Sequence, residues 1–235
     1  MEKSEYLKMF EVFKSKGVDI DSLYDKLFLY ASLLKEWNEK INLTSITEVN
    51  DVFVKHFYDS LLPTLYMDLD GKKLVDIGSG AGFPGAVIAL AYPKCDVTLV
   101  DATKKKFLFL EEIKNKLGIN NLSFYVQRVE LIKDKREYFD YCIARGFAST
   151  RIQIEVGTPL VKVGGEIVAM KSIKAEEEDS EAAKTKKKMF VNFKEKHKDI
   201  LPITLDIRAT YFYKKSRVTP RYYPRAWSLI STKSL

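Results

Sequence analysis

Hydrophobic and polar residues near the start of the chain follow the period of an amphipathic helix. Between Ser22 and Ile41 the apolar positions are spaced by four and three residues in turn, which indicates one buried helical face; they are Leu23, Leu27, Tyr30, Leu34, Trp37 and Ile41. A short polar loop, Asn42–Ser45, precedes a second helical stretch over Val52–Tyr66. We therefore predict an N-terminal helical extension, residues 1–66, packed on the rest of the chain.

From Lys72 onward, short β-branched runs alternate with helical segments. The predicted strands are Lys73–Ile77, Val97–Val100, Leu122–Val126, Phe139–Ile143 and Glu166–Met170, and the predicted helices are Val87–Ala91, Thr103–Leu117 and Arg151–Val161. Thr103 can cap its helix and Gly118 can end it. This alternation predicts an α/β fold with a parallel sheet and right-handed crossovers.

The last third of the chain has a different pattern. Ala175–His197 places acidic residues first and basic residues later, as a helix dipole favours. Ile203–Ile207 and Arg208–Tyr213 lie so close together that we predict an antiparallel hairpin at one sheet edge. The segment Thr219–Arg225 holds two prolines and shows no regular period. We assign residues 67–235 to one main domain that ends in a basic tail.

The segment Val75–Gly85 carries the most specific chemistry. It reads Val-Asp-Ile-Gly-Ser-Gly-Ala-Gly-Phe-Pro-Gly after a predicted strand, so Gly80–Gly85 formally matches the dinucleotide fingerprint GxGxxG. However, Asp76 would repel a pyrophosphate, and Pro84 lacks the N–H that an anion-binding helix start offers. A carboxylate at this place suits the ammonium and sulfonium groups of S-adenosylmethionine. We favour the methyl donor over a nicotinamide cofactor.

Residues after the next three strands extend this site. Asp101 ends the second strand, where a carboxylate accepts hydrogen bonds from ribose hydroxyls, a feature that dinucleotide enzymes share. Arg128-Val129-Glu130 follows the third strand, in a loop expected to face an adenine ring. Arg145 follows the fourth strand at the ligand-binding end of the sheet; the alternative is an arginine that only covers the sheet end.

Composition and charge narrow the class of protein. The 235 residues are 46% hydrophobic and 30% charged, which is enough apolar mass for one full core. The formal charge is +7, and 16 basic against 8 acidic residues follow position 170, so the whole surplus lies there. Such a surface attracts nucleic acid or an anionic membrane, or is simply solvated. There are two Cys and two His and no CxxC, so we expect neither a metal nor a disulfide.

Targeting signals are not evident in the sequence. No apolar run approaches the ~20 residues of a membrane span. The charged start, Met1–Glu5, is not followed by an apolar run and does not resemble a signal peptide. We expect a cytoplasmic protein, and a monomer because no sustained heptad is present.

Several motifs together resemble one known family. The motifs are the glycine loop Asp76–Gly85, Trp37-Asn38 with Ile41-Asn42-Leu43-Thr44, His56-Phe57-Tyr58-Asp59-Ser60-Leu61, and Tyr223-Pro224-Arg225. They occur in the order seen in the RsmG (GidB) family, and the similarity spans nearly the whole chain. The resemblance implies a class I, Rossmann-like, S-adenosylmethionine-dependent methyltransferase. Its implied target is N7 of a guanine of 16S ribosomal RNA, position 527 in standard rRNA numbering.

The resemblance also implies roles for individual residues. Residues implied to hold S-adenosylmethionine are Asp76, Gly78, Gly80, Gly82, Phe83, Asp101, Ala102, Val129, Glu130 and Arg145. Residues implied to act on the guanine are Asn42, His56, Asp59, Arg145 and Lys171, and those implied to contact RNA are Ser60, Lys171, Arg217, Arg221, Tyr223 and Arg225. The chain departs from the family at Ala144, Gly146, Ser172 and in Tyr222–Ser228, so the RNA contacts of the tail are the least secured by the motifs.

The chemistry of guanine N7 sets what such an enzyme needs. N7 has an exposed lone pair, so its methylation requires positioning and electrostatics rather than a general base. Arg145 or Lys171 could donate to guanine O6, and Asp59 could stabilise the cationic product; His56 could instead only order Asp59. The alternatives are a methyltransferase acting on another substrate and a non-enzymatic RNA-binding assembly factor.

The basic tail suggests further RNA contacts. Phosphate contacts are expected from Lys214, Lys215, Arg217, Arg221 and Arg225. Tyr211, Tyr213, Tyr222 and Tyr223 could stack on unpaired bases, although we favour hairpin packing for whichever of Tyr211 and Tyr213 points inward.

Overall fold

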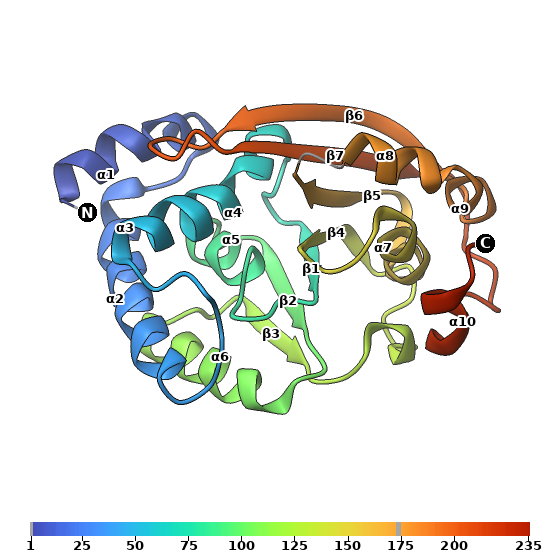
Figure 1. The fold of residues 1–235 in the computed structure, drawn as a ribbon, viewed down its shortest axis with the longest axis horizontal. Coiled ribbons are helices and arrows are strands. Elements are labelled where there is room, and N and C mark those ends of the chain that lie inside the picture. The colour runs from blue at the N-terminus through green and yellow to red at the C-terminus, as the bar shows by residue number, and fades with distance from the viewer. Residues whose placement is uncertain (1, 173–174) are drawn as a thin grey trace.

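A seven-stranded sheet forms the centre of the molecule in this computed structural model, which describes residues 2–172 and 175–235 (Figure 1). The strand order is β3-β2-β1-β4-β5-β7-β6. The bounds are β1 Lys73–Ile77, β2 Asp96–Val100, β3 Leu122–Tyr125, β4 Phe139–Arg145, β5 Val161–Lys171, β6 Val191–Ile200 and β7 Ile207–Lys215. Strands β1 to β5 are parallel, and β7 runs antiparallel to both β5 and β6. The predicted parallel sheet and C-terminal hairpin are confirmed.

Helices cover both faces of the sheet because strand side chains alternate between them. Leu74 points into the larger core with the N-terminal helices, while Val75 points into the core on the other face. Figure 1 shows the two groups to the left and right of the sheet. The first group is α1 Lys3–Phe10, η1 Glu11–Lys16, α2 Ile20–Asn38, α5 Gly85–Ala91 and α6 Lys104–Leu117; the second is α7 Thr150–Gly157, η5 Thr158–Leu160, α8 Ala175–Glu181, α9 Ala183–Lys188 and α10 Trp227–Thr232.

The N-terminal helices pack on the sheet domain as an integral layer. The predicted helix over Ser22–Ile41 is α2, and Asp19 caps it by accepting from Ser22 N–H at 3.1 Å. The helical stretch predicted over Val52–Tyr66 is built from α3 Val49–Asp51, a wider π turn η2 Val52–Tyr58, α4 Asp59–Leu61 and a tight 3-10 turn η3 Leu62–Tyr66. Trp37 Nε1 donates to Glu112 Oε2 on α6 at 2.8 Å. The extension and the main domain share one core.

The hairpin is real, but its first strand was wrongly placed at Ile203–Ile207. Residues Leu201–Asp206 form the turn, in which Ile203 and Leu205 are exposed and have positive φ. The strand is β6, which takes up the charged residues predicted to continue a helix to His197. As an outer strand, β6 exposes most of its side chains, so it lacks the apolar alternation that a half-buried strand shows.

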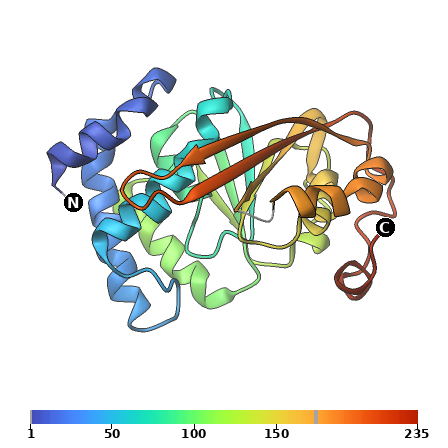
Figure 2. The same cartoon turned by 45° about the horizontal axis from the view of Figure 1, so that its top comes forward.

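The hairpin ties the two helical groups together. It passes over the sheet, and its turn lies beside the N-terminal helices (Figures 1 and 2), where Leu201 packs on Val54 and Leu62. Tyr211 and Tyr213 are both buried on the same face of β7. Neither ring can therefore stack on RNA, because two residues apart on a strand they point inward together.

Lys215 is also unavailable to RNA. Its side chain is fully buried, its Nζ forms an ion pair with Glu137, and it donates to the Val161 carbonyl oxygen at 2.7 Å. Lys215 therefore closes the base of the hairpin rather than contacting phosphate.

Candidate active site

The loop after β1 has a geometry that only glycine allows. Gly78 and Gly82 have φ of +73° and +93°, in the left-handed region. A Cβ atom on Gly78 would lie 2.3 Å from the Phe147 ring, and one on Gly82 would lie 2.4 Å from Tyr30 Oη. Tyr30 Oη donates to the Ala81 carbonyl oxygen at 2.6 Å. Helix α2 thus holds the loop in place from behind.

Asp76 lies at the end of β1, fully buried beneath this loop. Its Oδ2 accepts from Gly85 N–H at 2.8 Å, while Oδ1 has no partner among the described residues. Burial raises the pKa of Asp76 to about 7, although the charge of Arg145 opposes the shift. Ser79 Oγ is likewise buried without a described partner. A buried carboxylate lacking a cation fits a ligand that carries an ammonium and a sulfonium group.

A cavity of about 310 Å³ opens beside Gly78 at the carboxyl ends of β2 and β3. Asp101 lines it, with Oδ2 accepting from Gly80 N–H at 3.0 Å and Oδ1 from Thr103 N–H at 2.8 Å. Each carboxylate oxygen keeps a lone pair for a ribose hydroxyl. The other lining residues are Gly78, Val100, Ala102, Thr103, Lys106, Gln127, Arg128, Val129, Glu130, Phe147 and Trp227. This donor cavity fits an adenosine-type ligand.

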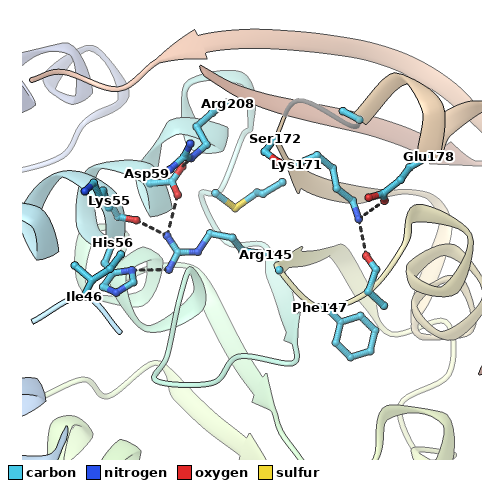
Figure 3. Close-up of a pocket in the computed structure, with 14 residues that line it drawn as sticks. Ile46, Lys55, His56, Asp59, Arg145, Phe147, Lys171, Ser172, Glu178 and Arg208 are labelled. Atoms are coloured by element: carbon cyan, nitrogen blue, oxygen red, sulfur yellow. Dashed lines mark hydrogen bonds and ion pairs between the residues drawn. The ribbon is translucent and has the colours of Figure 1, made fainter. Parts of the chain in front are cut away.

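Arg145 organises a second group of polar side chains at the end of β4 (Figure 3). Its Nη1 donates to Asp59 Oδ2 and to the Lys55 carbonyl oxygen, both at 2.9 Å. Its Nη2 lies 3.0 Å from His56 Nδ1. Arg208 of β7 reaches the same carboxylate, with Nε 3.2 Å from Asp59 Oδ1. The buried charge of Asp59 is therefore balanced by two guanidinium groups from different strands.

The contacts of His56 determine its tautomer. Because arginine has no acceptor, Nδ1 must accept from Arg145, so Nε2 carries the proton and donates to Thr44 Oγ1 at 2.9 Å. Burial and the neighbouring guanidinium lower the pKa of His56 to about 3. The ring stacks on Phe83 with 4.4 Å between centroids. His56 is thus neutral at physiological pH and contacts Arg145 rather than Asp59.

These side chains line a cavity of about 560 Å³ that adjoins the donor cavity. Its far wall contains Lys171, whose Nζ pairs with Glu178 Oε2 at 2.8 Å and donates to the Ala148 carbonyl oxygen at 2.6 Å. Phe147 lines both cavities. The second, substrate-facing cavity is therefore separated from the donor cavity by the ring of Phe147.

Comparison with known proteins now identifies the family. The family model described as rRNA small subunit methyltransferase G matches residues 23–201. The chain belongs to this family. It is 40% identical to a ribosomal RNA small subunit methyltransferase G of Staphylococcus epidermidis over 92% of each chain. It is 38% identical to one of Streptococcus gordonii, over 93% of this chain and 94% of that relative.

Solved structures support the fold of this methyltransferase G family member. A TYW2 protein of P. horikoshii in complex with MeSAdo has a TM-score of 0.53 at 18% identity, covering 68% of this chain and 62% of that one. A 16S rRNA adenine-N(1)-methyltransferase from Catenulisporales acidiphilia has a TM-score of 0.54 at 12% identity, covering 63% of this chain and 87% of that one. The chain therefore has the fold of S-adenosylmethionine-dependent methyltransferases, and S-adenosylmethionine is the cofactor of its family.

The structure divides the expected cofactor residues of this methyltransferase G chain into three groups. Those that line the donor cavity are Gly78, Asp101, Ala102, Val129 and Glu130. Those in or under the glycine loop are Asp76, Gly80 and Gly82. Phe83 and Arg145 lie elsewhere, with Phe83 stacked on His56 and Arg145 in the substrate-facing cavity. Arg145 therefore faces the acceptor side of the site.

The expected guanine-facing residues are only partly brought together. His56, Asp59, Arg145 and Lys171 line the substrate-facing cavity. Asn42 is exposed, does not line this cavity and has no hydrogen bond to any described residue. Ser60 is fully buried and donates to the His56 carbonyl oxygen at 2.5 Å. Ser60 was expected at the RNA surface, but here it supports the helix that carries His56 and Asp59.

Sequence reasoning missed several residues of the site. Thr44 was quoted within a motif, yet its contact with His56 was not foreseen. Arg208, Glu178 and Trp227 reach the two cavities from segments distant in sequence. No local pattern marks them, because pairing of β7 with β5 and docking of the tail bring them there.

The tail divides into exposed and anchored residues. Arg217 and Arg221 are exposed, as expected of RNA contacts. Tyr223 is only 7% exposed, and its carbonyl oxygen accepts from Arg136 Nη1 at 2.7 Å. Arg225 binds the buried Glu155 through Nε at 2.7 Å and Nη2 at 2.8 Å. Tyr223 and Arg225 thus fasten the tail to the domain.

Proposed function

We propose that this chain transfers the methyl group of S-adenosylmethionine to N7 of a guanine in 16S ribosomal RNA. The observation that carries the proposal is the pair of adjoining cavities that share Phe147. One holds the glycine loop and Asp101, and the other holds Arg145 and Lys171. This arrangement supports a reaction between two bound partners at the boundary of the cavities.

The chemistry asks little of the chain beyond positioning. S-adenosylmethionine supplies an activated methyl group, and the N7 lone pair needs no base. His56, held neutral by burial and Arg145, orients the guanidinium instead of accepting a proton. Two N–H groups of Arg145 have no partner among the described residues and remain for an acceptor such as guanine O6.

Asp59 is assigned a positioning role. Its carboxylate is 3% exposed and already faces two guanidinium groups. It therefore fixes the direction of Arg145 and Arg208 rather than contacting the product cation.

The proposal extends to a monomer acting in the cytoplasm on the small ribosomal subunit or its precursor RNA. Both cavities are completed by residues of one chain. No helix among the described residues is long and apolar enough to cross a bilayer.

Mapping of the methylated base tests the function. Small-subunit RNA and assembled subunits are treated with the protein and methyl-labelled S-adenosylmethionine, and the label is mapped by primer extension and mass spectrometry. We expect label at N7 of one guanine, and none with Gly78→Glu, because a side chain there meets Phe147 at a left-handed φ. Label on any other base would contradict the specific proposal.

A matched pair in the tail separates RNA contacts from anchoring. Arg221→Gln should weaken RNA binding and reduce the slope of log affinity against log salt by about 0.7, the value for one single-strand phosphate. Arg225→Gln should instead lower stability by about 3 kcal/mol, because it leaves Glu155 buried and unpaired. Filter binding over a salt series and chemical denaturation measure the two effects. A stable Arg225→Gln protein with weakened RNA binding would reverse the assignment.

A further inference from the structure

The C-terminal helix α10 is fixed to the domain by several independent contacts. Arg225, just before the helix, makes the two-point contact with Glu155. Arg151 Nη1 of α7 donates to the Ile230 carbonyl oxygen at 2.8 Å, and the Ile230 side chain is fully buried. A short helix held in this way presents its first residue, Trp227, in a defined place.

Trp227 belongs to the wall of the donor cavity. It lines that cavity together with Val129 and Glu130, which follow β3. The guanidinium of Arg128 lies over the indole, 4.4 Å from the ring centroid, and Arg128 Nε pairs with Glu130. Trp227, Arg128 and Glu130 therefore form one connected group at the end of the cavity built by the loop after β3.

Exposure and position argue against an RNA-stacking role for this ring. Tyr222 is 72% exposed, as a base-stacking platform must be, whereas Trp227 is half-buried. Trp227 also lies with residues of the nucleoside site and packs against the core of the second sheet face.

We propose that Trp227 is a donor-binding residue whose indole contacts the adenine ring of S-adenosylmethionine. The inference rests on the proposed function, since it requires that this cavity hold the donor. A flat apolar ring recognises the face of a purine by dispersion and stacking, and the Arg128–Glu130 pair keeps the indole in place. The C-terminal tail then completes the cofactor site.

Intrinsic fluorescence gives a direct test because the chain has only two tryptophans. Trp37→Phe leaves Trp227 as the sole emitter, and Trp37 does not line the donor cavity. Titration with S-adenosylhomocysteine should change the emission with the same Kd that calorimetry gives for the same protein. The fragment 5′-methylthioadenosine should also change it, whereas methionine should not.

Substitutions provide a second readout. Trp227→Ala should weaken S-adenosylhomocysteine binding by about 5- to 150-fold, the range for loss of one stacked base, and Trp227→Phe by less than about 5-fold. With saturating donor, kcat for RNA methylation should remain near that of the unmodified chain. Leu229→Ala is the matched control on α10, because Leu229 is exposed and does not line the cavity.

The outcomes distinguish the inference from the proposed function. Calorimetric binding with no change in Trp227 emission and an unaltered Kd in Trp227→Ala would overturn the inference and leave the function intact. An equal loss of affinity in Leu229→Ala would also overturn it, because the effect would then come from the helix as a whole. Absence of any binding to the unmodified chain would overturn both.

Discussion

Replacing Arg145 with lysine is expected to slow RNA methylation by about 100-fold while changing donor affinity by less than about threefold. Lysine keeps the charge but loses the planar fork that reaches Asp59, His56 and the Lys55 carbonyl oxygen together. Arg145 lines the substrate-facing cavity and not the donor cavity, so the effect should fall on the acceptor side.

Single-turnover methylation with saturating donor measures this effect. Calorimetry with S-adenosylhomocysteine serves as the check that the donor site is still folded. Arg217→Lys, the same substitution on the exposed tail, is the control and should alter the rate by less than about twofold. A fully active Arg145→Lys protein would mean that charge alone matters at this position.

Asp76→Asn is expected to weaken donor binding by about 100-fold and, at the same time, to stabilise the free protein at pH 8. The loss of affinity follows from removing the buried carboxylate that would face the donor's cationic groups. The gain in stability follows from the pKa of Asp76, which burial raises to about 7.

The sign of the stability effect follows from proton linkage. Between about pH 4 and pH 7 the folded chain keeps a proton on Asp76 that the unfolded chain has lost, so folding is favoured at the acidic end of this window. That contribution disappears as pH rises through about 7, and the unmodified chain is destabilised by up to about 4 kcal/mol relative to pH 4. Asparagine carries no such charge.

Urea denaturation at pH 5 and pH 8 should therefore show a stability gain for Asp76→Asn that is larger at pH 8. Donor affinity of the unmodified chain should fall as pH drops below about 7, because the protonated carboxyl no longer attracts a cation. Asp96→Asn, at the exposed start of β2, is the control and should show neither effect. A pH-independent stability difference would contradict the assignment to Asp76.

The parts of the fold that could be read from sequence are those with strong local periodicity. Strands β1 to β4 and helices α2 and α6 were found within a few residues, because each buries a regular set of apolar side chains. The first hairpin strand could not be found in the same way. Its exposed, charged face along β6 has no apolar alternation, whereas the apolar Ile203 and Leu205 occur in the turn.

The amino-acid sequence by itself determined the sheet class, the glycine loop, Asp76, Asp101 and the family, since these depend on residue types at short, constrained spacings. Only the tertiary structure decided how the second cavity is built. Arg145, Asp59, His56 and Arg208 come from separate elements, and burial forces their charges and hydrogen-bonding groups to pair with one another. It also decided that Lys215 and Arg225 stabilise the fold while Arg217 and Arg221 stay exposed. Net charge cannot make that distinction, because whether a cation meets a buried carboxylate or water depends on chain packing.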